Sequence, residues 1–575
     1  MNLLRLVATG ILTTLVVFAF GESLDGDFVW DDRELLETGT EWQGLDQETV
    51  SWVFTTYKNG HWQPLSWLSW TLDHARSGMD STGYHVTNLV LHGLNGIWVL
   101  VLGVALLARA APERSEVARF VVAFLASVLF VAHPLRVESV AWVTERRDLL
   151  SSFFLFGALY AWLRARTADG VHAKWYVGSL VLFAASLASK AWGLTLPAVL
   201  LVLAWWPLGL LDRRDDGSRP IAREIKLLLP YALLAAVCAR LAIWAQVGQG
   251  AMRFAEEMTF VQRSAQAANG LLWYPAKTLW PADQSPLYLL DTKLDPTSLP
   301  YLGAFLGVAL ITLGTLWLAR KRPAPFVAWM LFAILVSPVL GFAQSGGQAV
   351  AERYTYLSMI PLVLLLTSAF LPWIERRTPW IGIGLGAVLG LGLSMLAREY
   401  VGHWKSDLAL WDRACQVDDT NDFAFANRGE ARFQLLDFAG AREDFDRAIE
   451  LNPNGGLQLY QRGYLRAAVP PNDVAGALDD FARCLAIEPD NAKAHSCVGG
   501  LKLAMGENHV ALEHLDRAIE FGEDTPDVRR LRGMARAALG RRDGAVRDFE
   551  DALRRAPADW SMRAAVHELL ERTKR

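Results

Sequence analysis

The sequence predicts an all-α protein in two parts: a multi-span membrane helix bundle over residues 1–397 and a superhelix of paired helices over residues 398–575. Of its 575 residues, 52% are hydrophobic, and the charged side chains concentrate after residue 397. A low charge density with long apolar runs is typical of a lipid-embedded bundle. The net charge of -4 argues against nucleic acid as a partner. Four cysteines without CxxC spacing argue against a zinc site or a disulfide framework.

Apolar stretches of about 17 to 25 residues, long enough to cross a bilayer, predict about eleven spans. They lie near 2–20, 86–108, 117–135, 149–165, 174–190, 193–211, 226–246, 299–319, 324–343, 356–374 and 379–397. The first is interpreted as a retained anchor, because further spans follow it and no small-residue cleavage pattern closes it. The segment 264–282 contains Gly270 and Pro275 and is interpreted as re-entrant or interfacial.

Cations in the short loops predict the orientation, because Lys and Arg favour the cytoplasmic side. They occur in each loop that follows an even-numbered span, at Arg109, Arg114, Arg119, Arg164, Arg166, Lys174, Arg213, Arg214, Arg219, Arg223, Lys226, Arg320, Lys321, Arg322, Arg376 and Arg377. The N-terminus is therefore expected in the cytoplasm. Residues 398–575 are expected on the extracytoplasmic side, which is periplasmic, extracellular or ER-luminal.

Similar phrases recur in the C-terminal part. FDRAIELNP (445–453), FARCLAIEP (481–489), LDRAIEFGE (515–523) and FEDALRRAP (549–557) follow one another at intervals of 36, 34 and 34 residues. This resembles the tetratricopeptide repeat, whose period is about 34 residues. A half repeat is expected at 404–415 and a capping helix from about 558. Stacked helix pairs form a concave groove suited to extended peptides, so a protein or peptide partner is expected.

The predicted outer loop 21–85 is rich in carboxylates and begins with two adjacent aspartates, Asp31 and Asp32. Neighbouring carboxylates repel one another, and burial raises the pKa of one of them, which makes it a candidate general base. A solvated acidic loop is the plainer interpretation of the same composition. His85 follows at the entry to the second span and is a candidate site residue, although an interhelical hydrogen bond explains it equally well.

Ionisable groups also gather at the predicted outer membrane edge, where they are costly and usually functional. Two further outer loops and the turn at Lys190 supply them: His133, Glu138, Arg146, Arg147, Asp148, Lys190, Glu352 and Arg353. Lys190 alone is also explained by snorkelling to the interface. Because arginine binds phosphate bidentately, such a face suits a lipid-linked phosphate.

The chain resembles the TMTC family of transmembrane and tetratricopeptide repeat proteins. The resemblance rests on FVWDD (28–32), WQPLSWLSW (62–70), GYHVTNLVLH (83–92), HPLRVESVAWVTERRDLLS (133–151), SKAWGLTLP (189–197) and AERYTYL (351–357), followed by the repeats. It implies a GT-C type glycosyltransferase that moves a sugar, mannose in the animal members, from a polyprenyl phosphate to hydroxyl groups of proteins. The chain departs from the family at Ala191, where a Glu is common.

On this interpretation Asp31 or Asp32 is the base, and Arg353, Arg147 and Lys190 hold the donor phosphate, with Arg146 a further donor-binding candidate. The hydroxyl attacks the anomeric carbon opposite the leaving phosphate, so the reaction inverts the configuration. Glu138 and Asp148 position the cations or bind a sugar hydroxyl. A divalent Mg²⁺ or Mn²⁺ bridging Asp31, Asp32 and phosphate is an alternative. It is not favoured, because the arginines make a metal unnecessary.

Two other functions compete with this interpretation. The first is a non-catalytic membrane scaffold whose repeats recruit envelope or secretory proteins, which leaves the ionisable groups at the outer face unexplained. The second is a glycan polymerase or ligase, which shares the chemistry but uses a glycan acceptor.

Overall fold

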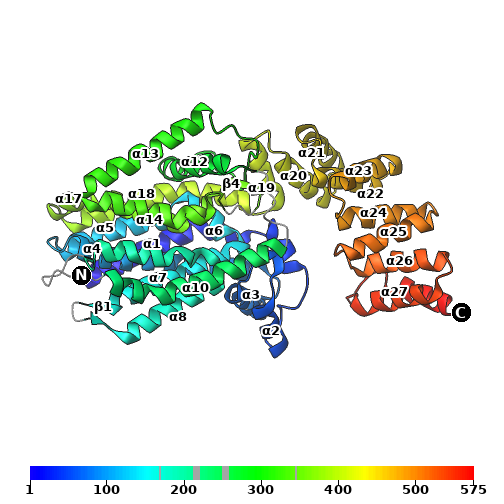
Figure 1. Ribbon diagram of the computed structural model, residues 1–575, viewed down its shortest axis with the longest axis horizontal. Coiled ribbons are helices and arrows are strands. Elements are labelled where there is room, and N and C mark those ends of the chain that lie inside the picture. Colours follow the sequence, from blue (N-terminus) through cyan, green and yellow to red (C-terminus); the bar gives the residue numbers. More distant parts are fainter. Residues whose placement is uncertain (168–169, 212–220, 249–257, 343–345, 558) are drawn as a thin grey trace. The chain divides into compact units, whose positions relative to one another are not determined.

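The computed structural model describes residues 1–167, 170–211, 221–248, 258–342, 346–557 and 559–575. The predicted cations Arg213, Arg214 and Arg219 lie outside them. The chain forms two compact units, Met1–Arg413 and Ala414–Arg575 (Figure 1). Residues 398–413, which the sequence assigns to the repeats, pack with the first unit: Trp404 is only 1% exposed.

The first unit is helical, as predicted. Its helices are α1 (Asn2–Phe20), α2 (Gln47–Thr55), α3 (Pro64–Ser77), α4 (Ser81–Ala110), α5 (Glu116–Val131), α6 (Val137–Ala141), α7 (Arg146–Ala165), α8 (Ala173–Ser189), α9 (Leu196–Trp205), α10 (Ile221–Gly248), α12 (Phe260–Leu279), α13 (Leu299–Ala319), α14 (Pro323–Val336), α15 (Thr355–Ser358), α16 (Ile360–Ser368), α17 (Leu371–Glu375) and α18 (Pro379–Val401). Among the described residues, strands are confined to two short antiparallel pairs, β1 (Arg166–Thr167) with β2 (Gly170–Val171) and β3 (Tyr288–Leu289) with β4 (Gln348–Val350).

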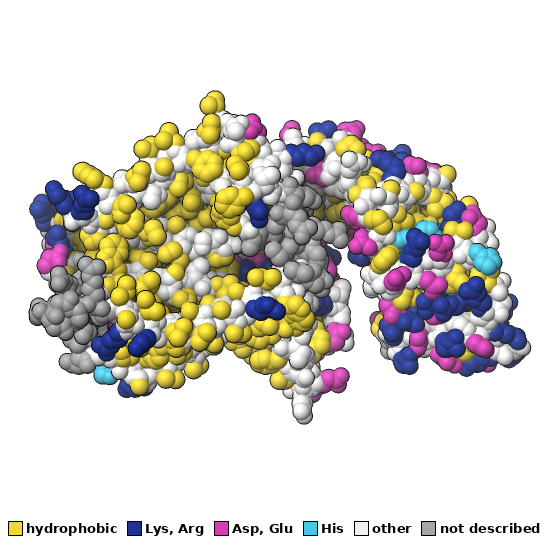
Figure 2. All heavy atoms as spheres, viewed as in Figure 1, with side chains coloured by type: hydrophobic (Ala, Val, Ile, Leu, Met, Phe, Trp, Pro, Cys, Tyr) yellow, Lys and Arg dark blue, Asp and Glu magenta, His cyan; other side chains and the backbone are white. Residues whose placement is uncertain are grey.

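Five helices in the described ranges are long and apolar enough to cross a membrane: Asn2–Asp25, Ser81–Ala110, Ile221–Gln246, Leu299–Ala319 and Pro379–Trp404. A sixth is added if Glu116–Val131 and Pro134–Ala141, bent by 61°, count as one span. The predicted number of about eleven is therefore not confirmed. Apolar side chains cover most of the visible surface of this unit (Figure 2). On α13, Leu299 and Trp317 are 85% and 74% exposed, as suits side chains that face lipid.

The cation-rich loops meet at one end of the bundle. Arg5 pairs with Glu116 at 3.0 Å, and Arg114 pairs with Glu375 at 2.7 Å. The C-terminal end of α7 lies at this same end of the bundle. There Arg166 pairs with Glu224. This grouping is what the predicted orientation requires, because the N-terminus and these loops must share one side of the membrane.

The segment 264–282 falls mostly within α12, which continues through both Gly270 and Pro275. Thr259 and Gln262 form a reciprocal capping box that fixes the start of this helix. The helix is not among the candidate spans. The expectation that this segment is re-entrant or interfacial stays a prediction.

The second unit consists of four helix pairs. They are α20 (Asp422–Gln434) with α21 (Phe438–Leu451), α22 (Gly456–Ala468) with α23 (Val474–Ile487), α24 (Ala492–Ala504) with α25 (Asn508–Glu520), and α26 (Pro526–Ala538) with α27 (Arg542–Arg555). Each recurring phrase begins in the second helix of a pair. The expected half repeat corresponds to α19 (Asp407–Val417), which joins the two units, and the capping helix to α28 (Arg563–Lys574).

A glycine on the first helix lets each pair close. A Cβ at Gly533 would lie 2.6 Å from the ring of Phe549, so a larger residue would force the helices apart. Gly429 meets Phe445 at the same 2.6 Å in the first repeat. The first residue of each recurring phrase therefore packs against a glycine of the preceding helix.

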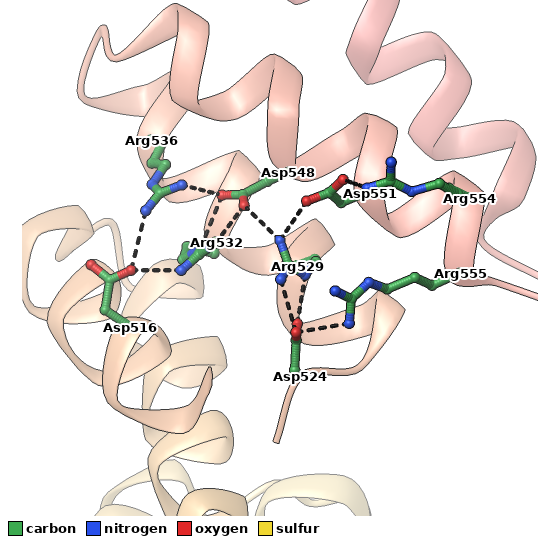
Figure 3. Close-up of polar contacts among 9 residues, drawn as sticks. All are labelled: Asp516, Asp524, Arg529, Arg532, Arg536, Asp548, Asp551, Arg554 and Arg555. Carbon is green, nitrogen blue, oxygen red and sulfur yellow. Dashed lines mark hydrogen bonds and ion pairs between the residues drawn. The ribbon is translucent and has the colours of Figure 1, made fainter. Parts of the chain in front are cut away.

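Arginines tie the second repeat to the first and the fourth repeat to the third. In the last repeat Arg532 donates two hydrogen bonds to Asp548, at 2.6 and 3.0 Å, and a third to Asp516 of the preceding repeat at 2.9 Å (Figure 3). Arg462 repeats the arrangement with Asp480 and Asp446. Bidentate pairs of this kind fix the angle between helices as well as their separation.

Candidate functional site

An unusual backbone conformation at Trp30 sets the position of the two aspartates. Its φ is 55°, in the left-handed region that bulky residues rarely adopt and that costs about 1 to 3 kcal/mol. The indole stacks on Trp142 with ring centroids 4.7 Å apart, and the Trp30 N–H donates to Asp407 Oδ1 at 2.7 Å. These two contacts hold the turn that leads into Asp31 and Asp32.

Asp32 and Asp31 have different surroundings. Asp32 is fully buried, and its carboxylate accepts hydrogen bonds from the N–H and hydroxyl of Thr144 at 2.6 and 2.5 Å and from the Val29 N–H at 3.2 Å. Asp31 is half-buried, and its carboxylate has no hydrogen bond or ion pair with any described residue. Asp32 therefore fastens the loop to the bundle, whereas Asp31 is left available for chemistry.

The pKa of Asp31 suits a base. Burial raises it to about 6, against the lowering effect of the nearby Arg147 and Arg353 cations. Burial raises the pKa of Asp32 to about 7, although the donors on Thr144 and Val29 oppose the shift. A carboxylate whose pKa is slightly below neutrality is mostly ionised at pH 7 and still accepts a proton effectively.

Glu145 is the centre of an ion cluster at the N-terminal end of α7. Its carboxylate pairs with Arg147 and with Lys190, each at 2.7 Å, and lies 3.6 Å from Arg353 Nε. Lys190 also pairs with Asp148 at 2.5 Å. Burial by itself would raise the pKa of Glu145, but the three cations hold it well below its usual range. The carboxylate is therefore ionised and keeps the three cations together.

Arg353 is fixed from a second side. Its backbone N–H donates to Glu138 at 2.7 Å, and its guanidinium pairs with the same carboxylate. Glu352 is turned away from this pair and accepts hydrogen bonds from the Tyr288 hydroxyl at 2.7 Å and from Gln284 at 3.4 Å. Burial, together with the neighbouring Glu138 carboxylate, raises the pKa of Glu352. Glu138 thus belongs to the cluster, and Glu352 supports the loop behind it.

Three other predicted site residues lie outside this cluster. Arg146 is fully buried and pairs with Asp73 in a separate network. His85 is buried against Gly26. His133 lies 2.9 Å from the Thr278 carbonyl through Nε2, and its Nδ1 accepts the Leu135 N–H at 3.2 Å. Arg146 and His133 thus hold helices and turns together, whereas neither ring nitrogen of His85 has a hydrogen-bond partner among the described residues.

The cluster keeps some capacity to bind a ligand. The side chains of Arg147, Lys190 and Arg353 are 11%, 18% and 10% exposed. The buried Nε of Arg147 has no hydrogen-bond partner in the described part of the chain. A small cavity adjoins Lys190 and is bordered by His61. Burial, with Arg147 and Lys190 close by, lowers the pKa of His61 to about 3, so its imidazole is neutral.

Sequence reasoning did not select Glu145 and His61. Glu145 stands between Glu138 and Asp148 in the same polar run at the predicted membrane edge, and that position was the available signal. Nothing local distinguishes it from its neighbours, because two of its three cationic partners, Lys190 and Arg353, come from distant segments. In the described residues no group of three or more His, Cys, Asp or Glu could hold a metal ion. The expectation that no metal is needed stays a prediction.

Comparisons with known proteins agree with the motifs. No protein-family model matches the chain. TMTC4 of Mus musculus, a protein O-mannosyl-transferase, is 26% identical over 72% of this chain and 62% of its own length. Human TMTC4 is 25% identical over 73% of this chain and 63% of its own, and human TMTC3 22% over 77% and 51%. A solved thermophilic TPR protein of Thermus thermophilus covers 32% of this chain and 96% of its own at 21% identity, with a TM-score of 0.25.

The chain spans less than two thirds of the length of these curated relatives. The matches to TMTC4 and TMTC3 nevertheless extend over most of this chain, and the described helices include both an apolar unit and a repeat unit. The resemblance predicted from the motifs is therefore confirmed: this chain is similar to the TMTC protein O-mannosyl-transferases.

Proposed function

We propose that the protein is a membrane glycosyltransferase that moves a sugar from a polyprenyl-phosphate donor to a hydroxyl group of a protein acceptor. In the proposed step the acceptor oxygen forms a bond to the anomeric carbon while the bond from that carbon to the phosphate oxygen breaks. The hydroxyl proton passes to Asp31, and the bonding electron pair leaves with the polyprenyl phosphate. Attack opposite the leaving group inverts the anomeric configuration.

The unpaired Asp31 carboxylate beside Arg147 and Arg353 is the observation that carries this proposal. A general base needs a free oxygen, access to its substrate and a pKa near the working pH. Asp31 meets these conditions better than Asp32, whose two oxygens are both occupied by hydrogen bonds. Asp31 is therefore assigned as the base.

The donor phosphate is proposed to bind at the cations around Glu145. Arg147 contributes the most, because its Nε lacks a partner and its guanidinium can present paired N–H groups to phosphate oxygens. Lys190 and Arg353 add charge beside it. Glu138, Glu145 and Asp148 hold these cations in place before the donor arrives, which is the preorganisation that favours a charged transition state. Neither a Mg²⁺ nor a Mn²⁺ ion is required in this scheme.

The acceptor is proposed to bind at the repeats on the extracytoplasmic side. Within the first unit, α18 starts at the end that carries the cation-rich loops and finishes near Glu22, where Lys405 pairs with that carboxylate at 3.1 Å. Residues 398–413 therefore reach the end of the bundle that carries the ion cluster. This supports placing the repeats on the side where transfer occurs. The sequence-based boundary at residue 397 would cut into packed structure, so a truncation test should end at Arg413.

The proposal is tested with the purified full chain in lipid nanodiscs. It is incubated with polyprenyl-phosphate mannose or glucose and with candidate protein and glycan acceptors, and the products are identified by mass spectrometry. We expect one sugar to appear on a protein hydroxyl with an inverted anomeric centre. Transfer to glycan but not protein would favour a polymerase or ligase. No transfer from any lipid-linked donor, with the protein folded, would favour a scaffold.

A further inference from the structure

An apolar cavity of about 250 Å³ lies inside the first unit, apart from the ion cluster. Helices α4, α7, α9, α14 and α16 form most of its wall, through side chains that include Val99, Leu155, Leu203, Leu331 and Leu364. It extends toward the end of the bundle where α4 and α17 meet the cation-rich loops, since Ala111 and Leu371 line it there. Such a space fits one hydrocarbon chain far better than a polar ligand.

A buried arginine lies at the other end of this cavity. A much smaller space of about 10 Å³ shares Val99, Ala126 and Ile360 with the large cavity and is bordered by Arg136. Arg136 is 2% exposed and donates to the Thr355 hydroxyl at 3.0 Å. The guanidinium also lies 5.4 Å from the Phe130 ring centroid. Its Nε has no hydrogen-bond partner, and within the described ranges no carboxylate pairs with it.

Arg146, another buried arginine of the first unit, has the partners that Arg136 lacks. It is just as buried, but it pairs with Asp73, donates to Asn88 at 2.7 Å and reaches the Tyr84 carbonyl at 2.5 Å. A buried charge without a counter-ion is costly, and rings compensate for only part of that cost. The difference between the two arginines points to an anion that joins Arg136 in the occupied protein.

We propose that this cavity binds a long-chain fatty acid, with its carboxylate at Arg136 and its hydrocarbon chain in the apolar space. The small cavity beside the guanidinium has room for about one water-sized group. A carboxylate fits this space more readily than a phosphate does, and it matches the two parallel N–H groups of arginine. A single apolar cavity takes one chain rather than the two chains of a phospholipid. None of the residues that line the two cavities belongs to the proposed donor site, and the proposal does not depend on transferase activity.

Binding of palmitate and of hexadecanol to the full chain in detergent micelles tests the proposal. Both ligands have the same chain length, and only palmitate carries the anion. Wild-type protein should bind palmitate about 10- to 100-fold more tightly than hexadecanol, as a charge-assisted hydrogen bond implies. Arg136→Leu should remove this preference while leaving hexadecanol binding nearly unchanged. Arg5→Leu, which alters an exposed arginine of the same unit, should behave like wild type.

A second variant tests the chain-binding part independently. Leu331→Trp fills the cavity and leaves Arg136 intact, so it should weaken binding of both palmitate and hexadecanol, and it decides the question if Arg136→Leu does not fold. Equal binding of the two ligands to wild type would overturn the proposal, as would palmitate binding that survives Leu331→Trp. Tighter, Arg136-dependent binding of an isoprenoid phosphate than of palmitate would also overturn the carboxylate assignment.

Discussion

The aspartates buried in the repeats and the glutamate buried in the membrane unit pair with arginine in different ways. In α21, α23 and α27 each buried aspartate receives a bidentate arginine from 16 or 18 residues earlier in the chain, within its own helix pair. Glu145 pairs with Arg147 two residues away and with two cations from distant segments, Lys190 and Arg353. The repeat pairs are local and recur with the sequence period. The membrane cluster exists only after distant segments have packed together.

This difference distinguishes charged groups that stabilise the fold from charged groups that can bind a substrate. The Asp548 carboxylate already has its hydrogen bonds from Arg532 and Arg536, and the network ends in exposed side chains such as Arg554 (Figure 3). At the membrane cluster, Asp31 stands beside the cations without a partner, and Arg147 has an unused donor. Charges that satisfy one another stabilise a fold, whereas unsatisfied charges next to them are available to a substrate.

Changing Asp31 should produce the largest effect. Asp31→Asn removes the base, so turnover should fall by about 10² to 10⁴ while the thermal unfolding transition stays in place. In the wild type the proton-accepting form is lost as the pH falls, so kcat/KM should drop tenfold per unit below a pH of about 6. Asp32→Asn should instead lower stability, because it weakens the contacts with Thr144. Full activity of Asp31→Asn would remove this residue from the mechanism.

Glu145→Gln should give the next largest effect, this time on stability. Three cations would lose the carboxylate that holds them, and breaking a buried ion pair in this way costs about 3 to 5 kcal/mol. Thermal unfolding of the full chain in micelles measures the change, which should appear only in the transition of the first unit. An unaltered transition would mean that the cluster contributes nothing to the fold.

Asp548→Asn is the matched change in the repeats. It weakens hydrogen bonds to charged partners, each worth about 1.5 to 3 kcal/mol, so the unfolding free energy of the second unit should fall by about that amount. Donor binding should stay at the wild-type level. Both quantities are measured in the same variant, because a loss of donor binding would show that the two ion networks are not independent.

Glu550→Gln should have the smallest effect. Glu550 pairs with Lys574 at 2.9 Å, but both side chains are about half exposed. Exposed pairs contribute little, since water and salt screen them. Circular dichroism melting of the repeat unit should therefore not change within error, and a clear shift would contradict the view that only the buried pairs hold the repeats together.

The class of each unit follows from sequence patterns alone. Apolar runs imply burial in lipid whatever their neighbours are, and the period near 34 residues implies stacked helix pairs, because each pair must cover the apolar face of the next. The gathering of carboxylates and cations at one predicted membrane edge could also be seen from the sequence. The number of spans could not, because chain direction changes within apolar stretches, as at the 61° bend after Val131.

Which ionisable residues are free and which are occupied depends on how distant segments pack together. Arg146 and Arg147 are adjacent at the start of α7, yet one meets Asp73 and the other meets Glu145. Neighbouring helical residues point about 100° apart, so their partners come from different sides of the bundle. Asp31 and Asp32 differ in the same way, since Thr144 reaches only Asp32. Contacts between distant segments set these roles, and no local pattern records them.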